Sequence, residues 1–162
     1  VDSSVSKDRV NWHSSRITSF VELPQYKMIV TSSIDKKLIF WDVYTKLAKQ
    51  VIHINKVSVE RLVYSVDYRV LFASSYEKYL QAYSFDTNDC YESGKLLGHT
   101  ATITAMEILK DSPMIVTVDE INFIKTWDVR DFWCVQTLHY DFKGQVQYIF
   151  NISSELFMMS TQ

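Results

Sequence analysis

The sequence predicts an all-β fold in which a four-stranded antiparallel sheet is repeated around a common axis. The first observation is a recurring dipeptide: Trp41-Asp42 returns as Trp127-Asp128, and a histidine lies 28 residues ahead of each pair, at His13 and His99. The second is the separation of 86 residues, which equals two steps of 43. A period of about 40 to 45 residues that ends in Trp-Asp is typical of one blade of a β-propeller.

A less obvious copy of the same pattern lies between these two. The segment Lys37–Val43 aligns with Tyr79–Phe85 and then with Phe123–Val129, at steps of 42 and 44 residues, and Tyr83 stands where the other copies have tryptophan. Asn55 takes the place of the histidine with the same unequal steps. Because the aromatic position and the histidine position recur with the same unequal steps, the sequence predicts three consecutive repeats.

Two further strands recur in the same register within each repeat, and a fourth copy of both follows the third repeat. They are rich in Val, Ile, Phe, Tyr and Thr, as strands require. The expected strands after the histidine place are Ile17–Phe20, Val59–Leu62, Ile103–Met106 and Val146–Ile149, and the next ones are Met28–Ser33, Val70–Ser75, Met114–Thr117 and Leu156–Thr161. We therefore predict a lead-in at 1–12, full repeats at 13–54, 55–98 and 99–141, and the first half of a fourth repeat at 142–162.

The predicted propeller is incomplete. A length of 162 residues would suit one ordinary domain, but closed propellers typically have about four to eight blades. The fold class is therefore an all-β propeller, with about three and a half four-stranded antiparallel blades that belong to a larger propeller. The chain opens at Val1 without a methionine and stops at Gln162, where a turn is due, so we expect part of a longer protein.

Composition and charge argue against several other classes of protein. A formal net charge of −2 does not indicate binding to nucleic acid phosphates, and no apolar run reaches the roughly 18 residues that a membrane span needs. Cys90 and Cys134 have no metal-ligand spacing and are expected to be reduced thiols. His53 and His139 lack neighbouring ligands as well. We therefore expect no metal, no cofactor, no nucleic acid partner and no insertion into a membrane.

On these repeats the chain resembles the WD-repeat family over essentially its whole length. In that family a histidine, a Ser or Thr, an Asp and the Trp of each repeat form a hydrogen-bonded tetrad inside the blade. The resemblance implies that the first repeat carries it as His13, Thr31 or Ser33, Asp35 and Trp41. Such a relay satisfies buried polar groups and fixes the strands relative to one another.

The other two repeats depart from the family pattern. The second has Asn55, Ala73, Glu77 and Tyr83 at the four places. The third keeps His99, Thr117 and Trp127 but has Ile121 at the aspartate place, with Asp119 and Glu120 just before it. We therefore expect a complete tetrad in the first repeat alone, and blades that are held together more by apolar packing than by polar networks.

A set of Ser or Thr, His and Asp also resembles a catalytic triad. A triad needs one exposed nucleophile with an oxyanion hole. Here the same residue types recur at the period of the blades and end in a tryptophan, which donates a hydrogen bond but does not react. The set is therefore predicted to be structural, and we do not expect an enzyme.

The resemblance also places a candidate binding surface. In the family, the loops before the first strand and between the second and third strands of each blade gather on one rim. Loops on a rigid scaffold are where recognition usually occurs. The rim residues that we predict to contact partners are Arg16, Lys36, Lys37, Tyr76, Glu77, Lys78, Thr102, Glu120 and Asn122.

The expected function is that of a non-catalytic scaffold for interactions between proteins. Divergent, glycine-poor repeats resemble the WD-repeat proteins of axonemal complexes, which implies a cytoplasmic subunit of a large cytoskeletal or ciliary assembly whose partners are the other subunits. The alternative is a peptide or substrate receptor, such as a ubiquitin-ligase adaptor or a trafficking coat subunit, which a basic or aromatic pocket on the rim would mark. A propeller enzyme would need convergent carboxylates or histidines at the channel, and the sequence shows none.

Overall fold

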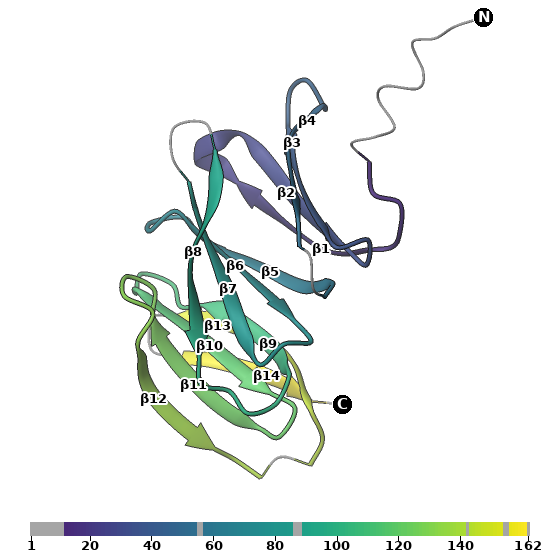
Figure 1. The fold of residues 1–162 in the computed structure, drawn as a ribbon. Coiled ribbons are helices and arrows are strands. Elements are labelled where there is room, and N and C mark those ends of the chain that lie inside the picture. The colour runs from purple at the N-terminus through teal and green to yellow at the C-terminus, as the bar shows by residue number, and fades with distance from the viewer. Residues whose placement is uncertain (1–11, 55–56, 86–88, 142, 154–155, 162) are drawn as a thin grey trace, which may run out of the picture.

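Four antiparallel sheets follow one another along the chain, and neighbouring sheets pack face against face (Figure 1). The structure is a computed structural model, and it describes residues 12–54, 57–85, 89–141, 143–153 and 156–161. The first three sheets each contain four strands in the order of the chain, and the last contains two. The predicted all-β class, with four-stranded antiparallel blades, is therefore confirmed.

The strands agree closely with the predicted repeats. The first sheet consists of β1 (Ile17–Leu23), β2 (Met28–Ser33), β3 (Lys37–Asp42) and β4 (Ala48–His53), with a short 3-10 turn, η2 (Pro24–Tyr26), after β1. The second consists of β5 (Val59–Ser65), β6 (Val70–Ser75), β7 (Tyr79–Phe85) and β8 (Cys90–Leu97). The third consists of β9 (Ile103–Ile108), β10 (Met114–Asp119), β11 (Phe123–Asp128) and β12 (Cys134–His139). The two-stranded sheet consists of β13 (Val146–Ser153) and β14 (Leu156–Thr161).

The three aromatic residues that mark the repeats occupy the same register position in their sheets. Each pairs with the second residue of the preceding strand: Trp41 with Ile29, Tyr83 with Leu71, and Trp127 with Ile115. On the other side of each aromatic residue, the pairing with the outermost strand shifts by one residue, as at a β-bulge. The predicted equivalence of the three positions is confirmed.

The aspartate of the Trp-Asp dipeptide shapes the turn that leads to the outermost strand. The Asp42 carboxylate accepts hydrogen bonds from the backbone N–H groups of Tyr44 and Thr45. The Asp128 carboxylate does the same for Arg130 and also accepts from its guanidinium. The backbone N–H of Thr45 and the ammonium of Lys49 lower the pKa of Asp42 below its ordinary value. A carboxylate that caps a turn in this way explains why the dipeptide recurs.

Three apolar cores hold the sheets together, one at each junction between neighbouring sheets. Leu38 and Phe40 of the first sheet belong to the same core as Leu62 of the second. Further cores lie between the second and third sheets and between the third and fourth. Cys90 is buried in the first of these cores, and burial raises the pKa of its thiol to about 12. Its thiol is therefore an unreactive part of the packing, and both Cys90 and Cys134 are free.

The first strands of the sheets form the inner side of the stack. β1 contacts β5, β5 contacts β9, and β9 contacts β13, although these strands are far apart in sequence. In Figure 1 the first sheet lies at the top, the second in the middle and the third at the bottom, with the two-stranded sheet behind it. Within the described ranges, no helix has the length and apolar character required to cross a bilayer.

Candidate functional site: a rim supported by two buried tetrads

In the first blade, four side chains form a continuous hydrogen-bonded chain. The Trp41 indole N–H donates to Thr31 Oγ1 over 2.8 Å, and Thr31 Oγ1 lies 2.7 Å from His13 Nε2. His13 Nδ1 lies 3.1 Å from each carboxylate oxygen of Asp35. Of the two hydroxyls that the sequence offered, the structure places Thr31 in this chain. Ser33 instead accepts a hydrogen bond from the backbone N–H of Asp35.

The donors and acceptors of the first tetrad are consistent with an ionised Asp35. Burial acts to raise the pKa of this carboxyl, but hydrogen bonds from the Ser14 backbone N–H and from His13 outweigh it, and the pKa of Asp35 lies below its ordinary value. His13 Nδ1–H then donates to Asp35, which leaves Nε2 to accept from the Thr31 hydroxyl. The N–H and O–H hydrogen atoms that link the four side chains each have an acceptor within the tetrad. The hydrogen-bonded chain is therefore complete without water.

The third blade contains the same chain, and our prediction that only the first repeat has a complete tetrad is wrong. Trp127 Nε1 donates to Thr117 Oγ1 over 2.8 Å, and Thr117 Oγ1 lies 2.7 Å from His99 Nε2. His99 Nδ1 lies 2.8 Å from a carboxylate oxygen of Asp119. The side chains of His99 and Asp119 are both fully buried.

Asp119 reaches the histidine from a different backbone position than Asp35 does. Both histidines lie 18 residues before the threonine, but Asp119 is the last residue of β10, whereas Asp35 lies in the turn after β2. The position of Asp119 corresponds to Ser33, and each accepts a hydrogen bond from the backbone N–H two residues later. Asp119 therefore combines the role of Ser33 in the turn with that of Asp35 toward the histidine. The alignment of the third repeat with the first had assigned Ile121 to the place of the aspartate instead.

Gly98, just before His99, allows the backbone to pass close to the Trp127 ring of the third tetrad. Gly98 has a φ of +145°, and a Cβ built on it would lie 3.3 Å from the Trp127 ring. Any other residue would meet both an unfavourable backbone conformation and the indole. The ring of His99 in turn lies 5.9 Å from that of Trp127.

Burial lowers the pKa of His99 below its ordinary value, despite the opposing effect of Asp119. In the unfolded chain a histidine gains its proton as the pH falls below about 6.5, while His99 in the folded protein gains its proton only at a lower pH. The unfolded state therefore binds more protons in acid, and the free energy of unfolding is expected to fall as the pH drops below about 6.5, by at most about 1.4 kcal/mol per pH unit. Denaturant unfolding at several pH values measures this slope. His99→Gln should reduce it, whereas the exposed-site control His139→Gln should leave it unchanged.

The second blade has no tetrad in the residues that the structure describes. Ala73 and Tyr83 stand 10 residues apart, like the threonine and tryptophan of the other blades. Ala73 offers no hydroxyl, and Tyr83 is almost fully buried. Burial raises the pKa of Tyr83. Asn55, at the histidine place, lies outside the described residues, and the Glu77 backbone N–H is held by Ser75.

The predicted rim loops are bound to each other by backbone hydrogen bonds. The Ile34 N–H donates to the carbonyl of Arg16, and the Glu120 N–H donates to the carbonyl of Thr102. The loop before the first strand therefore lies beside the loop between the second and third strands in both the first and third blades. Lys36 and Asn122 adopt the left-handed conformation, with a φ of 63° each, at equivalent places in these loops.

The rim residues differ in how far they are exposed. Arg16, Lys36, Tyr76, Lys78 and Glu120 are exposed, while Lys37, Glu77, Thr102 and Asn122 are half-buried. The sequence interpretation missed two apolar residues of the same loops. Ile34 is 41% exposed and Ile121 is 49% exposed, beside 64% for Tyr76. Each of these loops has three residues between its strands, and one of the three is a large apolar residue. This recurrence was the sequence signal that could have identified them as candidate binding residues.

A hollow of about 220 Å³ lies along the inner strands β1, β5, β9 and β13. It contains one basic residue, Arg61, whose guanidinium lies 4.8 Å from the centre of the Tyr148 ring, and one acidic residue, Glu107, whose pKa is raised by burial. Among the residues that the structure describes, no three His, Cys, Asp or Glu side chains converge as metal ligands do. The described lining thus offers one carboxylate and no histidine.

The sequence and the fold were compared with known proteins. Residues 5–42 match the family model of the WD domain, G-beta repeat. The solved structure entitled "Crystal structure of RRP9 WD40 repeats" superimposes on 93% of this chain and 46% of that chain, with a TM-score of 0.82 and 18% sequence identity. Residues 5–42 therefore match a WD repeat, and the fold of the chain is that of a WD-repeat propeller.

Two curated proteins are similar to this chain over longer stretches of the sequence. "Cilia- and flagella-associated protein 52" of Chlamydomonas reinhardtii is 28% identical over 118 residues, which are 69% of this chain and 18% of that protein. "Target of rapamycin complex subunit LST8" of Saccharomyces cerevisiae is 25% identical over 103 residues, which are 64% of this chain and 34% of that protein. The chain therefore spans about a fifth and a third of the length of these relatives.

Proposed function

We propose that this chain belongs to a non-catalytic propeller that holds other proteins of a multi-subunit assembly at its rim. The observation that supports it best is the run of exposed apolar residues Ile34, Tyr76 and Ile121 on three successive blades. They sit on loops that hydrogen bonds and packed strands hold in place. Exposed apolar groups on a rigid base, with lysines between them, are suited to binding a protein surface.

The same proposal includes the predicted rim residues and the division of the chain into repeats. Arg16, Lys36 and Lys78 place positive charge around the apolar residues, and Glu77 and Glu120 interrupt it. We further propose repeat boundaries at 13–54, 55–98 and 99–141, a lead-in at 1–12 and the first half of a fourth repeat at 142–162. The tetrads support the rim by fixing the ends of the strands from which the loops emerge.

The assembly that we favour is cytoskeletal or ciliary, with the protein in the cytoplasmic compartment of the cell. The similarity to a cilia- and flagella-associated protein supports it. The second relative is also a subunit of a complex, as its name states, which supports the scaffold role in general. A tagged full-length protein in ciliated cells tests the finer proposal, and diffuse staining with no signal in the cilium would contradict it.

Removing the apolar rim residues is expected to reduce the recovery of partner proteins at least tenfold. The variant is Ile34→Ser, Tyr76→Ser and Ile121→Ser in the full-length protein, and quantitative mass spectrometry of co-purified proteins is the measurement. The matched control removes three apolar residues of similar or greater exposure on or next to the outermost strands, as Tyr91→Ser, Trp133→Ser and Val135→Ser. Equal losses in both variants would show that the rim has no special role.

A peptide or substrate receptor is the second candidate, because the second blade contains a half-polar cavity lined by two tyrosines. A scaffold should co-elute with its partners in fixed ratio during size-exclusion chromatography. A receptor should instead exchange its client, so that excess competing client releases the bound one. Rapid exchange at the rim would favour the receptor over the scaffold.

A further inference from the structure

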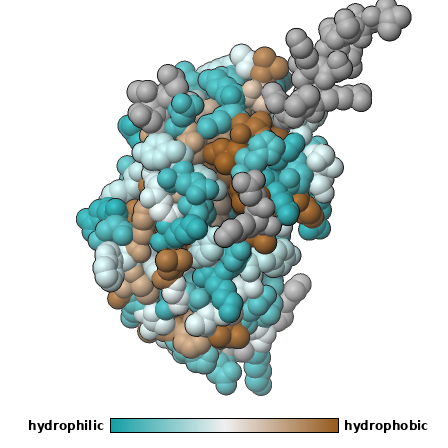
Figure 2. Space-filling view, in the orientation of Figure 1, coloured by the Kyte–Doolittle hydropathy of each residue, from teal (hydrophilic) through white to brown (hydrophobic). Residues whose placement is uncertain are grey.

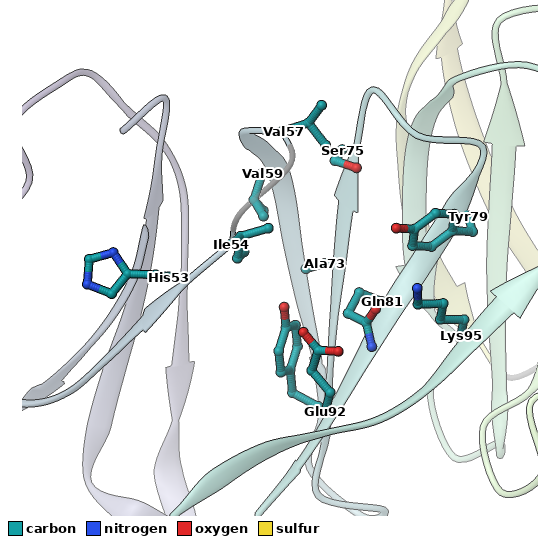
Figure 3. Close-up of a pocket in the computed structure, with 11 residues that line it drawn as sticks. His53, Ile54, Val57, Val59, Ala73, Ser75, Tyr79, Gln81, Glu92 and Lys95 are labelled. Atoms are coloured by element: carbon teal, nitrogen blue, oxygen red, sulfur yellow. The ribbon is translucent and has the colours of Figure 1, made fainter. Parts of the chain in front are cut away.

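A cavity of about 230 Å³ lies between the outermost strand of the first blade and the second blade (Figure 3). Its walls come from the end of β4 and the residues after it, from β6 and β7, and from β8. The lining residues used below are Ile54, Val59, Ala73, Ser75, Tyr79, Gln81, Tyr83, Glu92 and Lys95. Val59, Ala73 and Tyr83 are buried and form its floor, whereas Glu92 and Lys95 are exposed at its mouth.

The cavity occupies the part of the second blade where its neighbours have their tetrads. In the first and third blades, the space beside the equivalent strands holds a threonine hydroxyl, an imidazole and an indole. In the second blade, Ala73 provides one methyl group in place of the threonine, and Tyr83 provides a phenol ring in place of the larger indole. The loss of these atoms leaves room that the rigid sheet does not close.

The cavity opens at the same end of the blade as the rim. Ser75 and Tyr79 are the residues on either side of the loop that presents Tyr76, and both line the cavity. Figure 3 shows Ser75 and Val57 at one end and Glu92 at the other, with the Tyr79 hydroxyl directed inward and the ring of His53 turned away. Figure 2 shows apolar groups gathered next to the first sheet, amid a mostly hydrophilic surface.

Several polar groups of the cavity have no partner among the residues that the structure describes. Neither Glu92 nor the Tyr83 hydroxyl has a hydrogen bond or an ion pair there. The Gln81 amide nitrogen donates to the Gly94 carbonyl, which leaves the amide oxygen as an acceptor. The Lys95 ammonium lies 4.6 Å from the centre of the Tyr79 ring. The cavity therefore offers acceptors, hydroxyls and one cation beside an apolar floor.

We propose that this cavity receives a single tyrosine side chain from the protein that docks on the rim, an inference that rests on the proposed function. A cavity of about 150 Å³ holds benzene, so the larger space here accommodates a phenol ring. The ring would lie against Val59 and Ala73, and its hydroxyl would donate to the Glu92 carboxylate, a charge-assisted hydrogen bond. The mouth carries one charge of each sign, so an acidic or basic side chain is attracted by one and repelled by the other.

The test uses the full-length protein with 13C-labelled methyl groups and N-acetyltyrosinamide as the probe. The methyl signals of Ala73 and Val59 are expected to shift and to saturate at millimolar probe concentration. N-acetylargininamide and N-acetylglutamate should bind at least fivefold more weakly. Stronger binding of the arginine probe, or no shift of these methyl groups with the tyrosine probe, would overturn the proposal.

Two variants separate binding in the cavity from binding elsewhere. Ala73→Thr with Tyr83→Trp gives the second blade the residues found in its neighbours and should abolish the shift of the Val59 methyl signals. Glu92→Gln, a change at the exposed mouth, should weaken binding of the tyrosine probe about fivefold by replacing a charged acceptor with a neutral one. Its neighbour variant Tyr91→Ser should bind the probe as the unaltered protein does. Undiminished binding to the double variant would exclude the cavity as the site.

The result of the tyrosine-probe titration does not depend on the result of the experiment with the apolar rim variant. If the probe fails to bind while the apolar rim variant still loses its partners, the tyrosine proposal is wrong and the scaffold proposal stands. If the probe binds while the rim variant keeps its partners, the cavity is real but does not belong to a rim interface, and the proposal of a docked partner's tyrosine falls with the proposed function.

Discussion

Replacing Asp119 with alanine is expected to lower the free energy of unfolding by about 3–5 kcal/mol, because each buried donor that loses its acceptor costs about 1–3 kcal/mol. The Asp119 carboxylate accepts hydrogen bonds from His99 Nδ1 and from the backbone N–H groups of Ile121 and Phe123. Its side chain is fully buried. The substitution therefore leaves three donors without an acceptor in a place that water does not reach.

Two further substitutions show whether this loss arises from the tetrad. Glu120→Ala changes the exposed neighbour of Asp119 and should stay within about 0.5 kcal/mol. Asp35→Ala removes the corresponding carboxylate of the first blade, which is slightly more accessible, and should cost about 1–3 kcal/mol. Denaturant unfolding of the full-length protein gives all three values. A larger loss for Glu120→Ala than for Asp119→Ala would mean that the third tetrad contributes little to stability.

The blade architecture was predictable because its signal is a period rather than an individual residue. The three aromatic residues at Trp41, Tyr83 and Trp127 lie at one register position, and the sequence showed them through steps of 42 and 44 residues. A strand that must pair on both edges and pack on both faces tolerates few insertions. The length differences between repeats therefore fall in the turns and leave the pattern of the strands readable.

The third tetrad was missed because a side chain of the same type can reach one partner from two backbone positions. Asp35 lies four residues after Thr31, whereas Asp119 lies only two residues after Thr117. The alignment fixed the backbone position, but the chemistry requires only that a carboxylate meet the histidine nitrogen. The spacings of 18 and 10 residues from histidine to threonine and from threonine to tryptophan were conserved between the two blades and were the firmer signal.

The cavity of the second blade could not be predicted from the sequence, although its cause was visible there. The sequence showed that Ala73 and Tyr83 replace a threonine and a tryptophan, which predicts a broken relay. Whether neighbouring side chains fill the vacated space depends on their rotamers and on the distance between blades. The roles of Gln81, Glu92 and Lys95 in the walls follow only from the packing of β4 against the second blade.

The largest loss from a single truncation of an aromatic side chain is expected at Trp127, where alanine should cost about 3–5 kcal/mol. Trp127 is 1% exposed and belongs to the core between the second and third blades. Its removal would open a cavity there and would also leave Thr117 without the indole donor. Because Gly98 has no side chain, nothing on that side of the ring would move in to fill the space.

The three tryptophans of the described blades provide a graded control for this prediction. Trp41 occupies the equivalent position in the first blade but is only half-buried, with its ring edge-to-face against that of Trp12, so Trp41→Ala should cost less than Trp127→Ala. Trp133, just before β12, is 73% exposed, and its replacement by alanine should stay within about 0.5 kcal/mol. Denaturant unfolding of the three full-length variants should therefore rank the losses as Trp127, Trp41 and Trp133. Similar losses at Trp127 and Trp133 would contradict the assignment of Trp127 to a packed interface between blades, because burial is the physical property that separates these two positions.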